Sequence, residues 1–335
     1  MNSLLSEDFV LSRLARHFPN SHASLLLGRG DDAAVIKADK HLCVSSDLFL
    51  EDVHFRRSYF TPQEIGYKAL AVNLSDMAAC GAKPLGFTLC LGLPPRTEQM
   101  WLEDFFSGMA ALAGQYDTIL AGGDLSACEH LCIAVTIWGE TVGDSLDLRR
   151  GGCKPGDFLF VVGRLGLARV GLRILEARGR EAAPAWPAAC AAHLRPLPQI
   201  EAGLVISGFA DAENPPSVMD VSDGIARDLP RLLQTREGQG GEPVRQFGAS
   251  LRLPPETIHP EVRRFALEQE LDPVTEALLG GEDYALLGAC APDLLAKLRR
   301  AVPDLRPLGV VTEQPDIIAN GKPLKAEGFD HFTTG

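Results

Sequence analysis

Short apolar runs of strand length alternate along this chain with longer segments of helical spacing, and this alternation constrains the fold more than any other feature. In the first half, helical spacing covers residues 7–18, 62–79 and 98–116, and strand-like runs cover 33–36, 42–44, 87–93, 118–121 and 131–138. Pro62 falls in the first turn of the second helix and Gly81 just past its end, as expected at helix termini. The alternation has no regular βαβ rhythm, so it predicts an α/β (α+β) fold whose sheets are mixed or parallel.

A segment rich in glycine and charged residues, 144–156, divides the chain. It runs into the turn signal Lys154-Pro155-Gly156-Asp157, and 335 residues are enough for about two domains. We therefore expect an N-terminal domain of residues 1–143 and a C-terminal domain of residues 144–335. The second half has expected strands at 158–162, 284–287 and 317–319, expected helices at 167–177, 260–270 and 292–302, a turn at 163–166, an Ala- and Pro-rich segment at 178–192 and a Gly-rich loop at 236–243.

The charge balance limits the partners of this chain. With 44 acidic and 32 basic side chains the formal net charge is −12, which argues against binding to nucleic acids and to anionic membranes. The longest apolar stretch, 70–93, is interrupted by Asp76, Lys83 and Pro84, so we expect no membrane span. The first residues carry acidic rather than basic side chains, and we expect no signal peptide and a cytoplasmic protein.

The cysteines do not suggest a disulfide framework or a zinc site. There are eight of them, without any C-x2-C pair, and most lie within or beside apolar runs. A free cysteine in such a place behaves as a small apolar residue. We expect reduced structural thiols.

Carboxylates gather at the ends of apolar runs, beside glycine or serine. They occur as Asp31-Asp32 after Gly28-Arg29-Gly30, Asp47 after Ser45-Ser46, Asp124 after Gly122-Gly123, Asp220 and Asp223 around Ser222, and Glu282-Asp283 after Gly280-Gly281. Asp76 lies inside an apolar helical segment, where a carboxylate is costly to bury unless it is paired or binds a metal. Any single one of these acids is also explained as a helix or turn cap. Together, oxygen ligands from several loops favour Mg²⁺ and predict a magnesium–phosphate site.

Three other motif interpretations fit less well. Residues 28–33 match G-x-G-x-x-A, but a strand-like run follows where a dinucleotide site needs a helix. The turn 163–166 opens a helix after a strand and is placed to contact a phosphate, but it lacks the Lys-Ser/Thr of a P-loop, and a purely structural turn explains it better. A hydrolase is disfavoured because there is no G-x-S-x-G elbow, although His54 directly follows the acidic segment 47–52 and stays open as functional or structural.

Several longer motifs resemble thiamine-monophosphate kinases, in order and over nearly the whole chain. They are 28–34 (GRGDDAA), Ser46-Asp47, 53–55 (VHF), 67–79 (YKALAVNLSDMAA), 122–124 (GGD), 150–157 (RGGCKPGD), 220–224 (DVSDG), 280–284 (GGEDY) and 328–332 (GFDHF). Two departures concern local geometry: Asp52 stands where the family often has glycine, and Ser126 stands where threonine-rich sequence is common.

The resemblance implies a fold, a reaction and a set of site residues. The fold is the two-domain aminoimidazole ribonucleotide synthetase-like fold, with an N-terminal mixed sheet whose domain binds ATP and Mg²⁺ and forms a homodimer, and a C-terminal α/β domain that completes the substrate site. The reaction is ATP-dependent phosphorylation of thiamine monophosphate to thiamine diphosphate. By position, the implied magnesium ligands are Asp32, Ser45, Ser46, Asp47, Asp76, Asp124, Asp220 and Asp223; the implied ATP contacts are Gly123, Asp124, Arg150 and Ser222; the implied substrate contacts are His54, Glu282 and Phe329.

The residues also favour a mechanism without a general base. A phosphate monoester is already anionic near neutral pH, because its second pKa is about 6. We therefore expect direct in-line transfer in which several Mg²⁺ ions, held by the aspartates, neutralise the phosphates and Arg150 adds hydrogen bonds to ATP. We expect Phe329 to stack on the thiamine rings, with a C-terminal core anchor as the structural alternative.

Two alternative functions stay open at this point. One is a sibling ATP-dependent enzyme of the selenophosphate or aminoimidazole ribonucleotide synthetase kind, and the other a non-catalytic scaffold of the hydrogenase-maturation kind. The first cysteine, Cys43, lies in an apolar run rather than at a reactive N-terminal position, and the chain ends in His331-Phe332-Thr333-Thr334-Gly335 without a terminal cysteine. Both observations disfavour these alternatives.

Overall fold

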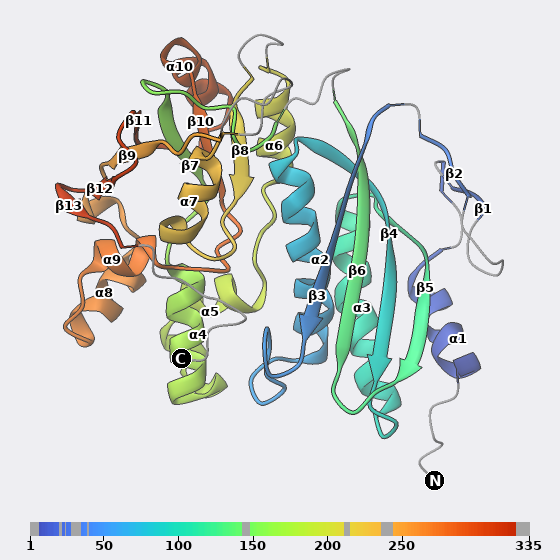
Figure 1. Ribbon diagram of the computed structural model, residues 1–335. Helices are drawn as coiled ribbons and strands as arrows, with labels where there is room; N and C mark the ends of the chain where they lie inside the picture. The colour runs from blue at the N-terminus through green and yellow to red at the C-terminus, as the bar shows by residue number, and fades with distance from the viewer. Residues whose placement is uncertain are drawn as a thin grey trace. The chain divides into compact units, whose positions relative to one another are not determined.

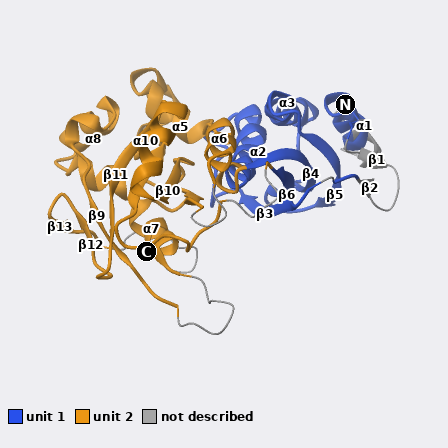
Figure 2. Cartoon of the chain, turned by 90° about the horizontal axis from the view of Figure 1, so that it is seen from above, with its two compact units in different colours: residues 1–77, 82–141 blue, residues 78–81, 142–335 orange. Residues whose placement is uncertain are grey.

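The fold of the chain is that of a computed structural model (Figure 1). The structure describes residues 7–19, 22–23, 25–27, 35–38, 40–142, 148–210, 215–235 and 244–325. Two predicted site residues, Asp32 and Phe329, lie outside these ranges, as does the expected loop 236–243. The chain forms two compact units, residues 1–77 with 82–141 and residues 78–81 with 142–335 (Figure 2). The roles expected for the two domains stay predictions.

The first unit is built on a mixed four-stranded sheet in the order β3-β6-β4-β5. Its strands are β3 (Leu42–Leu50), β4 (Ala82–Leu93), β5 (Ile119–Ala127) and β6 (Cys132–Thr141), and only the β4–β5 pair is parallel. Helices α2 (Pro62–Ala79) and α3 (Gln99–Gln115) lie on one face of this sheet, as both views show (Figures 1 and 2). The unit also contains α1 (Glu7–His17) and the short antiparallel pair β1 (Leu25–Leu27) and β2 (Val35–Ile36). Nε2 of His17, at the end of α1, lies 2.8 Å from Oε2 of Glu103 on α3.

Local signals explain why α2 forms where the sequence predicts it. Thr61 and Glu64 form a reciprocal capping box: the Thr61 N–H donates to Glu64 Oε2 at 2.8 Å, and the Glu64 N–H donates to Thr61 Oγ1 at 3.3 Å. Pro62 occupies the first turn, where it needs no N–H partner. The helix is buried over most of its length, and a β-carbon at Gly66 would collide with the carbonyl oxygen of Phe105 on α3, so the two helices pack closely.

The second unit is built on a seven-stranded sheet in the order β13-β12-β9-β11-β7-β10-β8. Its strands are β7 (Phe158–Val162), β8 (Ser217–Asp220), β9 (Gly248–Leu251), β10 (Leu286–Cys290), β11 (Leu305–Thr312), β12 (Ile317–Ala319) and β13 (Lys322–Pro323). All pairs of neighbouring strands in this sheet are antiparallel except β9–β12. Both sheets are therefore mixed, and the expectation of an α/β (α+β) fold is confirmed.

The helices of the second unit are short and mostly begin at proline. They are α4 (Leu167–Arg178), η1 (Arg180–Ala185), α5 (Pro187–Leu194), α6 (Ile200–Ser207), α7 (Ile225–Leu233), η2 (Pro255–Thr257), α8 (Pro260–Glu268), α9 (Pro273–Leu278) and α10 (Pro292–Ala301). The Ala- and Pro-rich segment is therefore largely helical, because proline at a first helical position favours a helix start. Within the described ranges, no helix combines the length and the apolar character that a membrane crossing requires.

Two expectations about local structure need correction. The strand predicted at 42–44 extends to Leu50, so Ser45, Ser46 and Asp47 lie inside β3 rather than after it. All eight cysteines are free thiols, as expected, but Cys90 and Cys128 are exposed rather than buried.

Candidate active site

In the first unit, Ser45, Asp47 and Asp76 form a compact acidic group. Residues at alternate positions of β3 point to the same face, and Ser45 and Asp47 therefore face α2, which carries Asp76. The Ser45 hydroxyl donates to Asp76 Oδ2 at 2.5 Å. Burial, and next the nearby charge of Asp76, raise the pKa of Asp47 to about 6.

Ser46 belongs to the opposite face of the same strand. Its hydroxyl lies 2.9 Å from Thr136 Oγ1 on β6, and it also donates to the carbonyl oxygen of Val135 at 3.3 Å. The alternation of a β-strand therefore separates Ser46 from the Asp47 carboxylate, although the two are adjacent in the sequence.

Asp124 lies at the other edge of this sheet. Residues that pair directly across strands share a face, and Asp124 pairs through Cys90 and Ala134 with Leu48, whereas Asp47 belongs to the neighbouring row. Asp47 and Asp124 are thus on opposite faces and three strand spacings apart, about 14 Å by ordinary sheet geometry. Within one first unit they are too far apart to bind the same ion directly.

Gly123, beside Asp124, has a backbone conformation that only glycine adopts readily. Its φ is +156°, and a β-carbon there would collide with the carbonyl oxygen of Leu89 on the neighbouring strand. The glycine therefore lets β5 pair closely with β4, and the exposed carboxylate of Asp124 follows it on this edge strand.

His54 is held by its own loop. The Leu50 N–H donates to His54 Nδ1 at 3.0 Å, and the imidazole stacks on Phe49 with 5.8 Å between ring centroids. Because Nδ1 accepts a hydrogen bond, the neutral ring carries its proton on Nε2, an assignment made from the hydrogen bond. The half-buried ring is thereby oriented with a donor at its other edge.

In the second unit, Asp220 ends β8, and the turn after this strand carries Ser222 and Asp223. Asp228 on α7, fully buried, accepts the N–H groups of Asp223 at 2.9 Å and Gly224 at 3.1 Å and so fixes this turn. Burial raises the pKa of Asp228 to about 6. Arg231 pairs with both acids, at 2.7 Å from Asp223 Oδ2 and 2.8 Å from Asp228 Oδ1.

The glycine-rich loop before β10 lies against the Ser222 turn. The Glu282 N–H donates to the carbonyl oxygen of Ser222 at 2.7 Å, and the Glu282 carboxylate lies 3.1 Å from Nδ1 of His193 on α5. Glu282 has a φ of +60°, a left-handed conformation that costs about 1–3 kcal/mol for a residue other than glycine and often occurs at functional sites. The structure thus brings together Ser222 and Glu282, two residues expected at the site.

Asp283, next to Glu282, supports the start of α4. Its two carboxylate oxygens accept the N–H groups of Gly166 at 2.5 Å and Ala168 at 3.0 Å. Burial raises the pKa of Asp283 to about 7, although these two hydrogen bonds act in the opposite direction. The turn 163–166 is therefore held in place by the Glu282 loop.

Arg150 is exposed in a turn near the start of the second unit. The backbone of this turn is fixed on both sides, since the Gly151 N–H donates to the carbonyl oxygen of Leu232 at 3.2 Å and the Gly152 N–H donates to Ser217 Oγ at 3.0 Å. A charged side chain on a fixed turn is suited to binding an anion.

The donor set of the first unit fits magnesium better than a transition metal. Among the described residues, no group of three or more His, Cys, Asp and Glu side chains is arranged to hold a metal ion. Mg²⁺ does not need such a group, because it is commonly bound through one or two carboxylates and completes its shell with water and phosphate oxygens. Asp47 and Asp76, two neighbouring carboxylates beside a hydroxyl, match that requirement.

The sequence did not indicate His193, Asp228 and Arg231. His193 lies in a segment without any recognisable motif, and its partner Glu282 is far away along the chain. Asp228 and Arg231 follow the Asp-Val-Ser-Asp-Gly motif at helical spacing, and this spacing was a usable signal that both face the turn.

Comparisons with known proteins agree with this architecture. Residues 30–141 match the family model of AIR synthase related protein, N-terminal domain. Thiamine-monophosphate kinase of Synechococcus elongatus is 34% identical over 316 residues, covering 91% of this chain and 92% of that protein. The crystal structure of thiamine-monophosphate kinase from Stenotrophomonas maltophilia superposes with a TM-score of 0.77 at 30% identity, covering 96% and 98%. A structure of AaThiL complexed with AMPPCP and TMP superposes with a TM-score of 0.74 at 31% identity, covering 90% and 91%.

The two α/β units, with this N-terminal match and these solved neighbours, define a protein of the AIR synthase-like fold class. Within that class, similarity extends over nearly the whole length of both partners. The chain belongs to the thiamine-monophosphate kinase family, and it is an enzyme of that family. The resemblance seen in the sequence motifs is confirmed.

Proposed function

We propose that this enzyme transfers the terminal phosphoryl group of ATP to thiamine monophosphate, giving thiamine diphosphate, by direct in-line displacement with Mg²⁺. Family membership supports the reaction, and the related AaThiL was solved with AMPPCP and TMP. The observation that carries the proposal is the Asp47–Asp76 pair: two neighbouring carboxylates on a protein of net charge −12 receive anionic substrates only together with cations.

The residues of this chain would divide the work between positioning and charge balance. Arg150 supplies charge-assisted hydrogen bonds to ATP, and Gly123 keeps the ATP contact that the family motif implies. Nε2 of His54 donates to the substrate, and Glu282, oriented by His193, accepts from it. No general base is assigned, because a phosphate monoester is largely ionised at neutral pH.

Mg²⁺ would be held by Ser45, Asp47 and Asp76 in the first unit, and bound there it would neutralise phosphate charge in the transition state. Asp124 belongs to the opposite sheet face, so we assign it to a different ion from that of Asp47. Asp220 and Asp223 carry the metal-binding role for the second unit, where Arg231 holds Asp223 in position. Ser46, Asp32 and Phe329 keep the roles expected from the family motifs.

A homodimer is part of the proposal, and the outer face of the first-unit sheet is its surface. The alternate β3 residues Leu42, Val44 and Leu48 are 42%, 65% and 58% exposed on this face, which α2 and α3 do not cover. Large exposed apolar side chains that line one sheet face mark an interaction site. We further place the protein in the cytoplasm, where its small phosphorylated substrates would be found.

The direct test is to incubate the purified chain with ATP, MgCl₂ and thiamine monophosphate and to detect thiamine diphosphate by mass spectrometry. We expect a product that requires all three components and is lost on chelation of Mg²⁺. ATP consumption with a different acceptor, and none with thiamine monophosphate, would instead identify a sibling enzyme of the same superfamily.

A further inference from the structure

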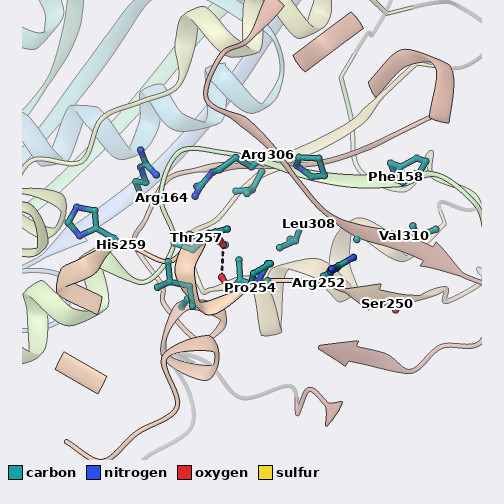
Figure 3. Close-up of a pocket in the computed structure, with 17 residues that line it drawn as sticks. Phe158, Arg164, Ser250, Arg252, Pro254, Thr257, His259, Arg306, Leu308 and Val310 are labelled. Carbon is teal, nitrogen blue, oxygen red and sulfur yellow. Dashed lines mark hydrogen bonds between the residues drawn. The ribbon is translucent and has the colours of Figure 1, made fainter. Parts of the chain in front are cut away.

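A pocket of about 730 Å³ lies entirely within the second unit, formed by β7, β9, β11 and the segments around η2 and α9 (Figure 3). Most of its wall is apolar, from Val161, Leu165, Leu253, Ile258, Ala277, Leu308 and Val310. Three arginines also line it: Arg164, Arg252 and Arg306. No acidic side chain is among the lining residues in the described part of the chain, and none of the site residues discussed above lines it.

Of the three arginines, Arg306 has a side chain held in the pocket wall by a hydrogen bond. It is half-buried on β11, and one of its guanidinium nitrogens donates to the carbonyl oxygen of Gly163, which fixes the side chain in the wall. Burial, and next the positive charge of Arg164, lower the pKa of Arg306, while Asp304 acts in the opposite direction. An arginine keeps its charge in a protein. Arg164 and Arg306 therefore place two positive charges close to each other beside an apolar cavity.

His259 adds a neutral donor to the same wall. Its Nδ1 accepts the Glu261 N–H at 3.2 Å at the start of α8, so the neutral ring carries its proton on Nε2. Burial, together with the charges of Arg164 and Arg263, outweighs Glu261 and lowers the pKa of His259, which keeps the ring uncharged at neutral pH.

The strand that carries Arg306 is irregular at the pocket. The register of β11 against β7 shifts between Pro307 and Gly309. The carbonyl oxygen of Leu308 accepts the backbone N–H of Arg252 at 2.7 Å. Bulges of this kind re-aim side chains and are common beside binding sites. Arg306 and Leu308, one cationic and one apolar, both line the pocket at this irregularity.

We propose that this pocket is a binding site for an organic anion, a molecule with an apolar or aromatic body and a terminal anionic group held by Arg164 and Arg306. The volume lies within the range of small-molecule sites, and an apolar wall with a few convergent polar groups is the usual composition of such sites. The cationic lining excludes a cationic ligand and distinguishes this site from one for a thiazolium ring.

The site is a neighbour of the Glu282 loop without being part of it. Arg306 holds the carbonyl oxygen of Gly163, and the other end of the same turn, Gly166, is held by Asp283. The proposal therefore goes beyond the phosphoryl transfer reaction and does not depend on it.

Fluorescence titration with anilinonaphthalene sulfonate tests the proposal, because this probe is an aromatic anion that brightens in apolar surroundings. The titration is done on the full chain without ATP or thiamine monophosphate. We expect saturable binding, about tenfold weaker in Arg164→Gln, since a charge-assisted hydrogen bond contributes about 1.5–3 kcal/mol. Thr257→Trp, at an exposed lining position, should fill the pocket and abolish binding.

Matched controls make the outcome decisive. Arg300→Gln changes an exposed arginine of α10 outside the pocket and should bind the probe as the unaltered protein does. Anilinonaphthalene without the sulfonate should bind much more weakly. Equal binding by Arg164→Gln and Thr257→Trp, or equal binding of the uncharged probe, would overturn the proposal. Because no turnover is involved, failure here leaves the kinase assignment untouched, and failure of the kinase assay leaves this result untouched.

Discussion

Asp76 on α2 lies close enough to Asp47 on β3 for its charge to help raise the pKa of Asp47 to about 6, while the Ser45 hydroxyl donates to the Asp76 carboxylate at 2.5 Å. Two ionised carboxylates at such a distance repel each other unless a cation lies between them. A folded chain keeps this arrangement at a cost in stability, and proteins often accept such a cost at functional sites.

Removal of either carboxylate should therefore reduce turnover strongly and preserve the fold. For Asp47→Asn and Asp76→Asn we expect the rate of thiamine diphosphate formation to fall on the order of 10²-fold or more, since a metal ion contributes several kcal/mol to the transition state. Thermal unfolding without Mg²⁺ should be unchanged or shifted upward, because the repulsion is relieved. Asp293→Asn, an exposed change on α10, is the control. Near-normal turnover in both variants would contradict the metal-site assignment.

His193 should act on the substrate only through Glu282. We expect Glu282→Gln to raise the KM for thiamine monophosphate about tenfold, which corresponds to one charged hydrogen bond, and to change kcat much less. His193→Gln should raise the same KM by a smaller factor. The KM for ATP reports on unrelated damage, and Glu268→Gln, an exposed acid paired with Arg178, is the control. A loss confined to kcat would exclude a positioning role.

Particular elements show what could be predicted from the sequence. Helix α2 was predicted at its observed bounds, because its signals are local: a capping box, an early proline and apolar residues all around. Strand β3 was predicted too short, because three consecutive polar residues, 45–47, interrupt its apolar pattern. Among them, Asp47 takes an inward position that a hydrophobic pattern assigns to an apolar side chain. Functional residues commonly break local rules in this way.

For the candidate site too, local sequence patterns indicated single residues but not how these residues are arranged. Asp47, Asp76 and Glu282 stood out through their glycine and serine neighbours or their apolar surroundings. The pairing of Glu282 with His193 and the separation of Asp47 from Asp124 depend on strand order and tertiary packing, which no local pattern specifies. The sequence therefore identified candidate ligands but not which of them can share an ion.

Asp52, which stands where the family often has glycine, has a φ of +64°. A left-handed conformation costs a non-glycine residue about 1–2 kcal/mol, less for aspartate, whose short side chain bonds locally. We expect Asp52→Gly to keep or slightly raise the free energy of unfolding and Asp52→Ala to lower it by about 1 kcal/mol. Urea unfolding measures both variants. An alanine variant at least as stable as the glycine variant would contradict the backbone explanation.

The outer face of the first-unit sheet should be needed for the homodimer. Val44→Lys and Leu48→Lys place charges at positions 65% and 58% exposed, and each should shift the mass measured by light scattering from dimer to monomer. Leu267→Lys, at a position 81% exposed on α8 of the second unit, should leave the mass unchanged and serves as the control. A dimeric Val44→Lys/Leu48→Lys double variant would assign the interface to another surface.

We expect Asp157 to make the stability of the second unit depend on pH. Its side chain is 5% exposed and accepts the backbone N–H of Lys154 at 2.9 Å. Burial raises the pKa of Asp157 above the ordinary 3.8 despite that hydrogen bond. Between pH 3.8 and the raised pKa, the folded chain therefore keeps a proton on Asp157 that the unfolded chain has released. The stability that this bound proton contributes is lost as the pH rises through the folded pKa.

Asp157→Asn keeps a carbonyl acceptor for Lys154 and cannot ionise. Its free energy of unfolding relative to the unaltered protein should therefore increase between pH 4.5 and pH 7, measured by urea unfolding at each pH. Asp293→Asn, at an exposed position, should show a difference that is nearly constant over the same range. If the Asp157→Asn difference is constant with pH, or decreases, then the buried carboxyl group is ionised throughout and its hydrogen bond outweighs the burial.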